Sequence, residues 1–245
     1  MMRTGNPMLH GETFTSAGVG VIGERMTIEG TVNKTLIMLF ILVLAAGWVW
    51  GKTMGQEAPI GLMMGGAIGG FIVGLVTFFK KDWAPITAPI YAGLEGLFLG
   101  GISAYFETKF PGIVIQAVAL TFGTLFCLLI AYRSGMIQVT QNFRLGVVAA
   151  TGAIMVVYLV SMVMGFFGTG IPFIHEGGTI GILFSLFVVV IAALNLVLDF
   201  DFIEHGAEAG APKFMEWFAA FALMVTLIWL YLEILRLLAK LNSRR

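Results

Sequence analysis

The sequence has 245 residues, of which 58% are hydrophobic and only 11% are charged, and its mean hydropathy is +0.95. These values lie far outside the range of soluble globular domains and indicate an integral membrane protein. Lys and Arg total 14, as do Asp and Glu, so the chain lacks the basic excess that is typical of nucleic-acid-binding proteins. The one cysteine, Cys127, excludes an internal disulfide.

Seven segments are long and apolar enough to cross a bilayer as helices. A hydrocarbon core of about 30 Å needs roughly 20 helical residues at 1.5 Å each. In chain order, the segments that meet this length are 35–51, 59–79, 86–106, 112–132, 145–167, 178–200 and 214–239. The sequence therefore predicts an all-α, polytopic membrane protein, with a polar N-terminal leader over residues 1–33 and a seven-helix transmembrane domain over residues 34–245.

Basic residues in the short loops predict the orientation, because cytoplasmic loops carry the excess of Lys and Arg. If the N-terminus is cytoplasmic, that side holds Arg3, Arg25, Lys34, Lys80, Lys81, Arg133, Arg144 and Lys213. The first three outer loops then hold only Lys52 and Lys109. We therefore expect a cytoplasmic N-terminus, although seven spans then place the basic C-terminal tail outside, against the same rule.

Glycines form two rows on the second predicted span and continue on the third. On the second span, Gly61, Gly65 and Gly69 form one row, and Gly66, Gly70 and Gly74 form the next. The third span contains Gly93, Gly96, Gly100 and Gly101. Such rows allow helix backbones to approach closely, so these two helices are expected to pack against each other or against a neighbour.

Carboxylates at membrane depth are costly, at roughly 2.5 to 3.5 kcal/mol each on insertion scales, so each one needs an explanation. Glu95 lies near the middle of the third span, and no basic residue in its own helix can reach it. It is expected to be protonated, paired across helices or exposed to water. Asp199 closes the sixth span one turn after Asn195, so this polar pair should share a face of the helix. The acids that follow, Asp201 and Glu204, are expected to emerge into water.

The last span contains two further acids, each with a plain structural interpretation. Glu216 lies in the first helical turn, where an interfacial acid is favoured by the helix dipole. Glu233 precedes Arg236 by one turn, so an i,i+3 ion pair is the alternative to a functional carboxylate.

Catalytic and cofactor-binding motifs are absent from the sequence. The three histidines, His10, His175 and His205, are far apart and lack zinc-binding spacing. There is no nucleophile elbow, phosphate-binding loop or CxxC pair. We therefore expect neither an enzyme nor a bound cofactor.

Several stretches resemble one known family. LNLVLDFDFIEHG at the end of the sixth span and LYLEILRLL in the last resemble the C-terminal pattern of the transmembrane Bax inhibitor motif family. RTGNPML and MTIEGTVNKT near the N-terminus, with YAGLEGLFLG in the third span, are similar to its bacterial Bax inhibitor-1-like branch. The resemblance covers nearly the whole chain.

The resemblance implies a seven-helix bundle with a central last helix, in the inner membrane of a bacterium, and a pH-dependent leak of Ca²⁺. In the family, an aspartate late in helix six and another in helix seven form a pH-sensitive latch, and these positions fall on Asp199 and Glu233. The same two carboxylates would then be the Ca²⁺ ligands. The family's basic residue at the end of helix two would be Lys80. The acidic partner of that residue is missing from GGAIGGFIVG, and Glu95 is the only acid placed to substitute.

The spacing leaves the partner of Asp199 open. Glu233 follows Asp199 by 34 positions and would lie near the opposite end of the last helix, roughly 30 Å away, whereas Glu216 is on the same side as Asp199. Two such acids in low dielectric would share one proton near neutral pH, and deprotonation would open a path that attracts Ca²⁺. The expected partners are thus the lipid bilayer, protons and Ca²⁺. The alternative function is a non-transporting scaffold or regulator of other membrane proteins.

Overall fold

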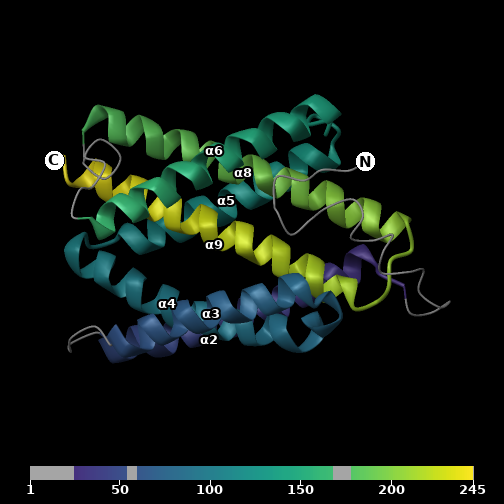
Figure 1. The fold of residues 1–245 in the computed structure, drawn as a ribbon, viewed down its shortest axis with the longest axis horizontal. Helices are drawn as coiled ribbons and strands as arrows, with labels where there is room; N and C mark the ends of the chain where they lie inside the picture. Colours follow the sequence, from purple (N-terminus) through teal and green to yellow (C-terminus); the bar gives the residue numbers. More distant parts are fainter. Residues whose placement is uncertain (1–24, 54–59, 168–177, 245) are drawn as a thin grey trace. The chain divides into compact units, whose positions relative to one another are not determined.

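The computed structural model describes residues 25–53, 60–167 and 178–244 (Figure 1). These residues form α2 (Ile28–Thr53), α3 (Ile60–Phe79), the 3-10 helix η1 (Lys81–Trp83), α4 (Ala84–Lys109), α5 (Ile113–Arg133), α6 (Gln141–Phe166), α8 (Thr179–Glu208) and α9 (Met215–Asn242). The seven long helices are each long and apolar enough to cross a membrane. The predicted all-α fold with seven spans is therefore confirmed. Most of the predicted leader lies outside the described residues.

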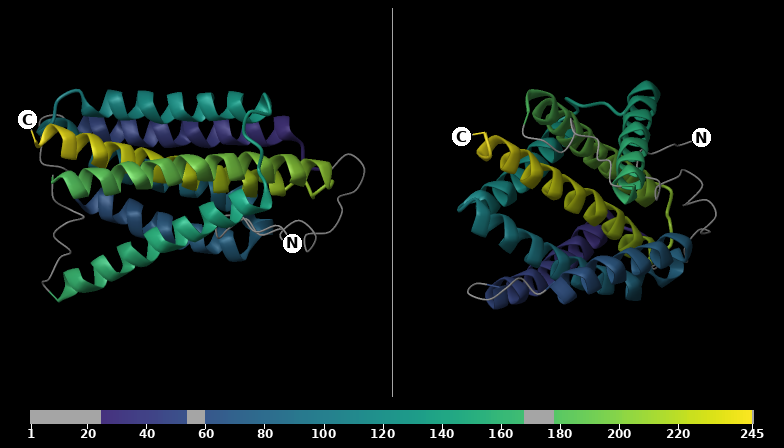
Figure 2. Two further views of the ribbon diagram at one scale, coloured as in Figure 1. Left: turned by 90° about the horizontal axis from the view of Figure 1, so that it is seen from above. Right: turned by 60° about the vertical axis from the view of Figure 1, so that its left-hand side comes forward.

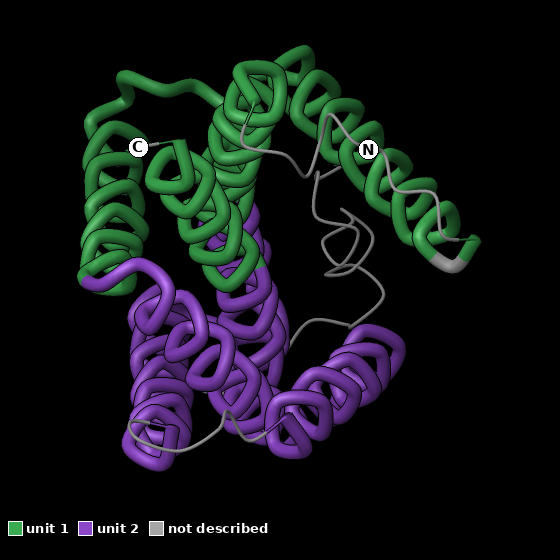
Figure 3. The backbone as a smooth tube through the Cα atoms, turned by 90° about the vertical axis from the view of Figure 1, so that its left-hand side faces the viewer, with its two compact units in different colours: residues 1–10, 112–201, 226–245 green, residues 11–111, 202–225 purple. Residues whose placement is uncertain are grey.

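The chain divides into two compact units (Figure 3). Unit 1 comprises residues 1–10, 112–201 and 226–245, and therefore contains α5, α6, most of α8 and the second half of α9. Unit 2 comprises residues 11–111 and 202–225, and contains α2, α3, α4, the end of α8 and the start of α9.

In unit 2, α4 packs against both α2 and α3 (Figure 2). Glycines allow these approaches: a Cβ atom built on Gly96 would lie 2.5 Å from the carbonyl oxygen of Leu42 in α2, and one on Gly66 would lie 2.6 Å from that of Leu94 in α4. The other glycine row of α3 is more open: Gly61 and Gly65 have nothing within 4 Å of such a Cβ, and one on Gly69 would meet only the Leu94 side chain, at 3.3 Å. One of the two predicted rows thus packs the second and third spans together.

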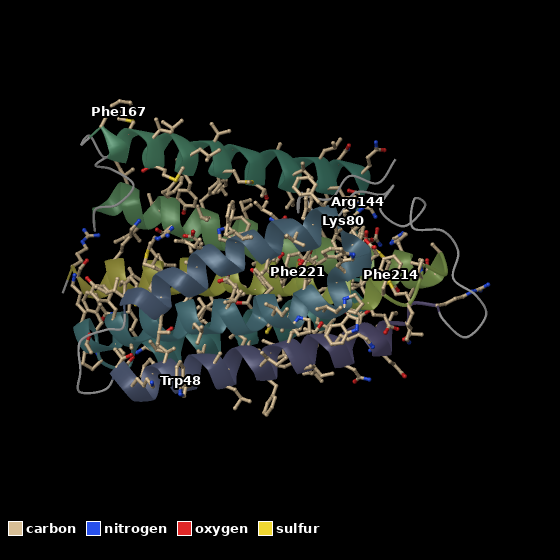
Figure 4. All side chains as sticks on the ribbon, turned by 60° about the horizontal axis from the view of Figure 1, so that its bottom comes forward. Trp48, Lys80, Arg144, Phe167, Phe214 and Phe221 are labelled. Carbon is tan, nitrogen blue, oxygen red and sulfur yellow. The ribbon has the colours of Figure 1, made fainter. Side chains whose placement is uncertain are left out.

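The last helix is the most enclosed of the seven described spans. In its most apolar stretch 83% of residues are buried, against 17% in α2. Phe218, Phe221, Met224 and Leu230 are all fully buried along it, and Figure 4 labels Phe221 on this helix. Burial along its length is typical of a helix that is apolar on all faces. The predicted central position of the last helix stays a prediction.

Two helices extend beyond their predicted ends by seven or more residues. Helix α2 begins at Ile28, within the predicted leader, because the N–H of Gly30 donates to the Thr27 hydroxyl over 2.9 Å and so caps the first turn. Helix α8 continues eight residues past position 200 to Glu208, and the chain turns only at Gly210, where φ is +66°. Phe202 in this extension is only 2% exposed, so the helix does not end where its polar residues begin.

Candidate functional site

Helix α6 carries three polar side chains at intervals of seven residues: Arg144, Thr151 and Tyr158. Seven residues are almost two helical turns, so the three side chains lie on one face. We call them the α6 polar stripe. All three lie in unit 1, as do the residues that they contact in α8 and in the second half of α9.

Each member of the stripe has its own partner. Arg144 forms an ion pair with Asp201 of α8. Asn195 of α8 donates its amide to the Thr151 hydroxyl over 2.8 Å. The sequence-based expectation that Asp201 emerges into water is therefore wrong: Asp201 is 7% exposed, because an arginine on the neighbouring helix neutralises its charge.

Asp199 lies between these two contacts along α8. It is 1% exposed and follows Asn195, itself 2% exposed, by one turn. Helix α8 continues for nine residues, or about 13 Å, beyond Asp199, so this residue is not at the end of its helix. The carboxyl group is consequently inside the protein, in the stretch of α8 bounded by Asn195 and Asp201.

Glu233 of α9 binds the third member of the stripe. The Tyr158 hydroxyl donates to Glu233 Oε1 over 2.9 Å, and Arg236 Nη1 donates to the same oxygen over 2.8 Å and to the Tyr158 hydroxyl over 2.9 Å. The i,i+3 ion pair considered from the sequence is thus present. Glu233 is 2% exposed, whereas the Arg236 side chain is 42% exposed.

The contacts of the stripe also show how far apart the two predicted latch residues, Asp199 and Glu233, lie along the helix axes of unit 1. Helices α6 and α8 are antiparallel here, because Arg144 meets Asp201 and Thr151 meets Asn195. Tyr158 lies seven residues beyond Thr151, on the side away from Asp201. Asp199 lies one turn from Asn195 in the opposite direction. Tyr158, which binds Glu233, is therefore about 16 Å from the level of Asp199 along the helix axes.

The end of unit 1 beyond Glu233 contains a buried lysine. Lys240 is 6% exposed, and its ammonium group donates to the Ser185 hydroxyl over 2.8 Å and to the Gly181 carbonyl over 3.1 Å. These bonds join the last turns of α9 to the first turns of α8. Since Glu233, Arg236 and Lys240 follow one another along α9, this half of unit 1 combines one carboxylate with two cations.

Glu216, the other acid considered in the last helix, belongs to unit 2 and is fully buried. Its Oε1 accepts hydrogen bonds of 2.9 Å from both the N–H and the hydroxyl of Thr27, and one of 2.8 Å from Lys213. Its Oε2 lies 2.8 Å from the Lys34 ammonium. The plain interpretation of Glu216 as an interfacial acid at a helix end is therefore incomplete, because this carboxylate joins the first turn of α9 to the first two turns of α2. Gly30 leaves room for it, since a Cβ there would overlap the carboxylate.

The remaining candidates, Glu95 and Lys80, also lie in unit 2. Glu95 is half-buried in the middle of α4 and lies against Gly70 of α3. Lys80 is exposed at the end of α3, where Figure 4 labels it. Of the histidines, His10 and His175 are outside the described residues. Within the described ranges, no three His, Cys, Asp or Glu side chains are grouped so that they could hold a metal ion.

Sequence reasoning missed most of these contacts. Arg144 was counted only for orientation, and Thr151, Tyr158 and Thr27 were not considered. A seven-residue spacing of polar residues within an apolar span was the available signal for the stripe. For Thr27, the signal was a capping residue directly before a helix.

The comparisons with known proteins agree with this architecture. A family model described as Bax inhibitor 1 like matches residues 6–243, nearly the whole chain. No curated protein shows a significant match.

Proposed function

Because the chain belongs to the Bax inhibitor-1-like family, we propose that it is a pH-sensitive leak channel for Ca²⁺, gated by carboxylates buried in its membrane helices. The membrane would be the inner membrane of a bacterium, with the N-terminus in the cytoplasm. The observation that carries the proposal is the burial of Asp199, which is 1% exposed in the interior of a membrane-spanning helix.

A buried carboxyl group in this position is suited to respond to protons. Binding a proton removes a negative charge from the low-dielectric interior, so the protonated form favours the closed packing. Loss of the proton leaves a negative charge that draws in water and cations. Ca²⁺, a hard cation that prefers oxygen ligands, would benefit from this charge. It would also benefit from the side-chain oxygens of Asn195, one turn away on α8, and of Thr151, which meets Asn195 from α6. Protonation would then close the path again.

The neighbouring contacts support a gate at this level. Arg144 and Asp201 join α6 to α8 on one side of Asp199, and Thr151 and Asn195 join the same helices on the other. A change in the charge of Asp199 would therefore affect both of the contacts that hold α6 against α8. Glu233, which is held by Tyr158 and Arg236, would act at the far half of unit 1, where the cations Arg236 and Lys240 oppose cation entry. Asp199 is therefore our first choice for the gating proton, and Glu233 for a second control point.

The test is Ca²⁺ flux into liposomes that contain the purified protein and a calcium dye, measured over a pH series. We expect flux to rise with pH in the wild type and to lose its pH dependence in Asp199→Asn, which mimics the protonated state and should stay closed. Glu233→Gln and Glu216→Gln in the same assay identify which helix α9 carboxylate contributes. Asp82→Asn, at an exposed position outside the stripe, is the matched control and should behave like the wild type.

An unchanged pH profile in Asp199→Asn would refute the gate. An absence of flux at every pH from correctly folded protein would instead favour the alternative function, a scaffold or regulator that acts through other membrane proteins.

A further inference from the structure

Glu95 belongs to unit 2 and is at the middle of its helix, as the twelfth of the 26 residues of α4. It lies opposite Gly70, the eleventh of the 20 residues of α3. Both helices run the length of a membrane span, so the carboxyl group is near the centre of the bilayer. No hydrogen bond or ion pair joins this carboxyl group to another residue in the described part of the chain.

A niche in α3 holds this side chain. A Cβ built on Gly70 would lie 2.7 Å from Glu95 Oε1, so the absence of a side chain at Gly70 is what admits the carboxyl group. Next to Gly70 in the same row, Gly74 faces Tyr91, which precedes Glu95 by one turn of α4. The row Gly70 and Gly74 therefore accommodates the two ionisable side chains of the α4 face.

Among the described residues, the helices of unit 2 that surround Glu95 carry no cation at its level. Helix α3 contains no charged residue along its whole length. The charged residues of α2 are Glu29, Lys34 and Lys52, and all three are near its ends. Next to Glu95, at Gly96, the residue of α2 in contact is the apolar Leu42. In the part of α9 that belongs to unit 2, the charged residue is Glu216, while Phe221 meets Tyr91 edge-on. Tyr91 is thus the titratable group that faces Glu95.

From this geometry we propose that Glu95 is a proton-binding carboxyl group within the bilayer, protonated at neutral pH and therefore a modification site for hydrophobic carbodiimides. An isolated carboxylate at this depth would carry an uncompensated charge in hydrocarbon, and binding a proton removes it. The ligand is a proton rather than a metal ion, since Ca²⁺ requires six to eight oxygen ligands and, in the described ranges, no three His, Cys, Asp or Glu side chains are grouped to hold a metal. The inference does not depend on ion flux and stands even if the proposed function fails.

The modification reports directly on the proton. The carboxyl group transfers its proton to a carbodiimide nitrogen while its oxygen adds to the central carbon, and the acyl group then migrates to nitrogen to give a stable N-acylurea with no leaving group. Ionised carboxylates in water lack the proton for the first step. Hydrophobic dicyclohexylcarbodiimide reaches the bilayer centre, whereas a charged, water-soluble carbodiimide does not.

The experiment treats the full-length protein in liposomes with dicyclohexylcarbodiimide between pH 6 and 9 and locates the adduct by peptide mass spectrometry. We expect an adduct on Glu95 that forms readily at pH 7, forms more slowly as the pH rises, and is absent with the water-soluble reagent. Glu95→Gln should remove it. Gly70→Ala, which narrows the niche, should change the labelling rate at least threefold, whereas Gly65→Ala on the same helix, where a Cβ meets nothing within 4 Å, should not.

The wild-type result alone decides the matter even if a variant fails to fold. Lack of an adduct on Glu95 at pH 7, a rate independent of pH, or equal labelling by the water-soluble reagent would each show that this carboxyl group is ionised or open to water, and would overturn the inference.

Discussion

Among individual residues, Glu216 shows how a buried charge is tolerated at the edge of a membrane. Its carboxylate is fully buried, and four donor groups from Thr27, Lys34 and Lys213 surround it. Burying a charge is strongly unfavourable unless it is paired and hydrogen-bonded, and here both oxygens have a cation within 2.8 Å. The carboxylate therefore links the N-terminal ends of α2 and α9.

We predict that Glu216→Gln destabilises the protein by about 2 to 3 kcal/mol, because the amide keeps the shape but leaves the Lys34 ammonium, 20% exposed, without its counter-charge. The loss should be at the lower end of the range for broken buried pairs, since Lys213 is 49% exposed and can be hydrated. Thermal unfolding in detergent measures the effect. Glu29→Gln, at an exposed position in the first turn of α2, should have little effect, and equal effects of the two changes would contradict the assigned role of Glu216.

The helices, taken one at a time, were predictable from the sequence to different degrees. Helix α3 was expected at 59–79 and is Ile60–Phe79, because apolar residues alone define it. The start of α2 and the end of α8 were not predictable from hydropathy. In each case a polar residue continues the helix by meeting a partner far away in the chain, as Thr27 meets Glu216 and Asp201 meets Arg144.

For the candidate site, the sequence allowed single residues to be identified but not their contacts. Asp199, Glu216 and Glu233 could be singled out because a carboxylate in an apolar segment is conspicuous. Their partners could not be assigned, since local spacing does not reveal which face of one helix meets which face of another. Tyr158 and Glu233, for example, are 75 positions apart.

Close packing of α4 on α2 gives a prediction about a glycine. We expect Gly96→Ala to destabilise the protein by about 1 to 3 kcal/mol, because its Cβ would lie 2.5 Å from the Leu42 carbonyl and the backbone of α2 would have to move. The control is Gly47→Ala in α2, where a Cβ meets nothing within 4 Å, and this change should be neutral or stabilising by up to about 1 kcal/mol. Thermal unfolding of both variants in detergent distinguishes them, and a Gly96→Ala protein as stable as the control would refute the close contact.

For the whole molecule, the seven described spans place the two ends of the chain on opposite sides of the membrane, provided that each one crosses it. With a cytoplasmic N-terminus, the end of α3 at Lys80 is cytoplasmic, and the ends of α4 and α9 are outside. The basic residues Lys80 and Lys81 then obey the positive-inside rule. Lys240 would lie on the outer side, against that rule, but it is buried and donates hydrogen bonds to Ser185 and Gly181.

This orientation can be tested with alkaline phosphatase, which is active only outside the cytoplasmic membrane. We predict high activity for fusions after Phe110 and after Ser243, and low activity for a fusion after Lys80. Green fluorescent protein at the same positions should give the opposite pattern. A reversed pattern in both reporters would place the N-terminus outside.

The seven-residue spacing of Arg144, Thr151 and Tyr158 also determines how far α6 can turn about its own axis. Hydrocarbon tails contact any apolar face of a helix equally well, so lipid does not select one rotation of α6 over another. Many side chains of this helix are exposed, among them Met155, Val156 and Leu159. The three polar contacts, together with the packing of Ile154 against Val188 and Ile191, therefore favour one rotation of α6 about its axis. A rotation of one residue, about 100°, would remove all of them at once, so the helix has one preferred setting rather than a continuous range.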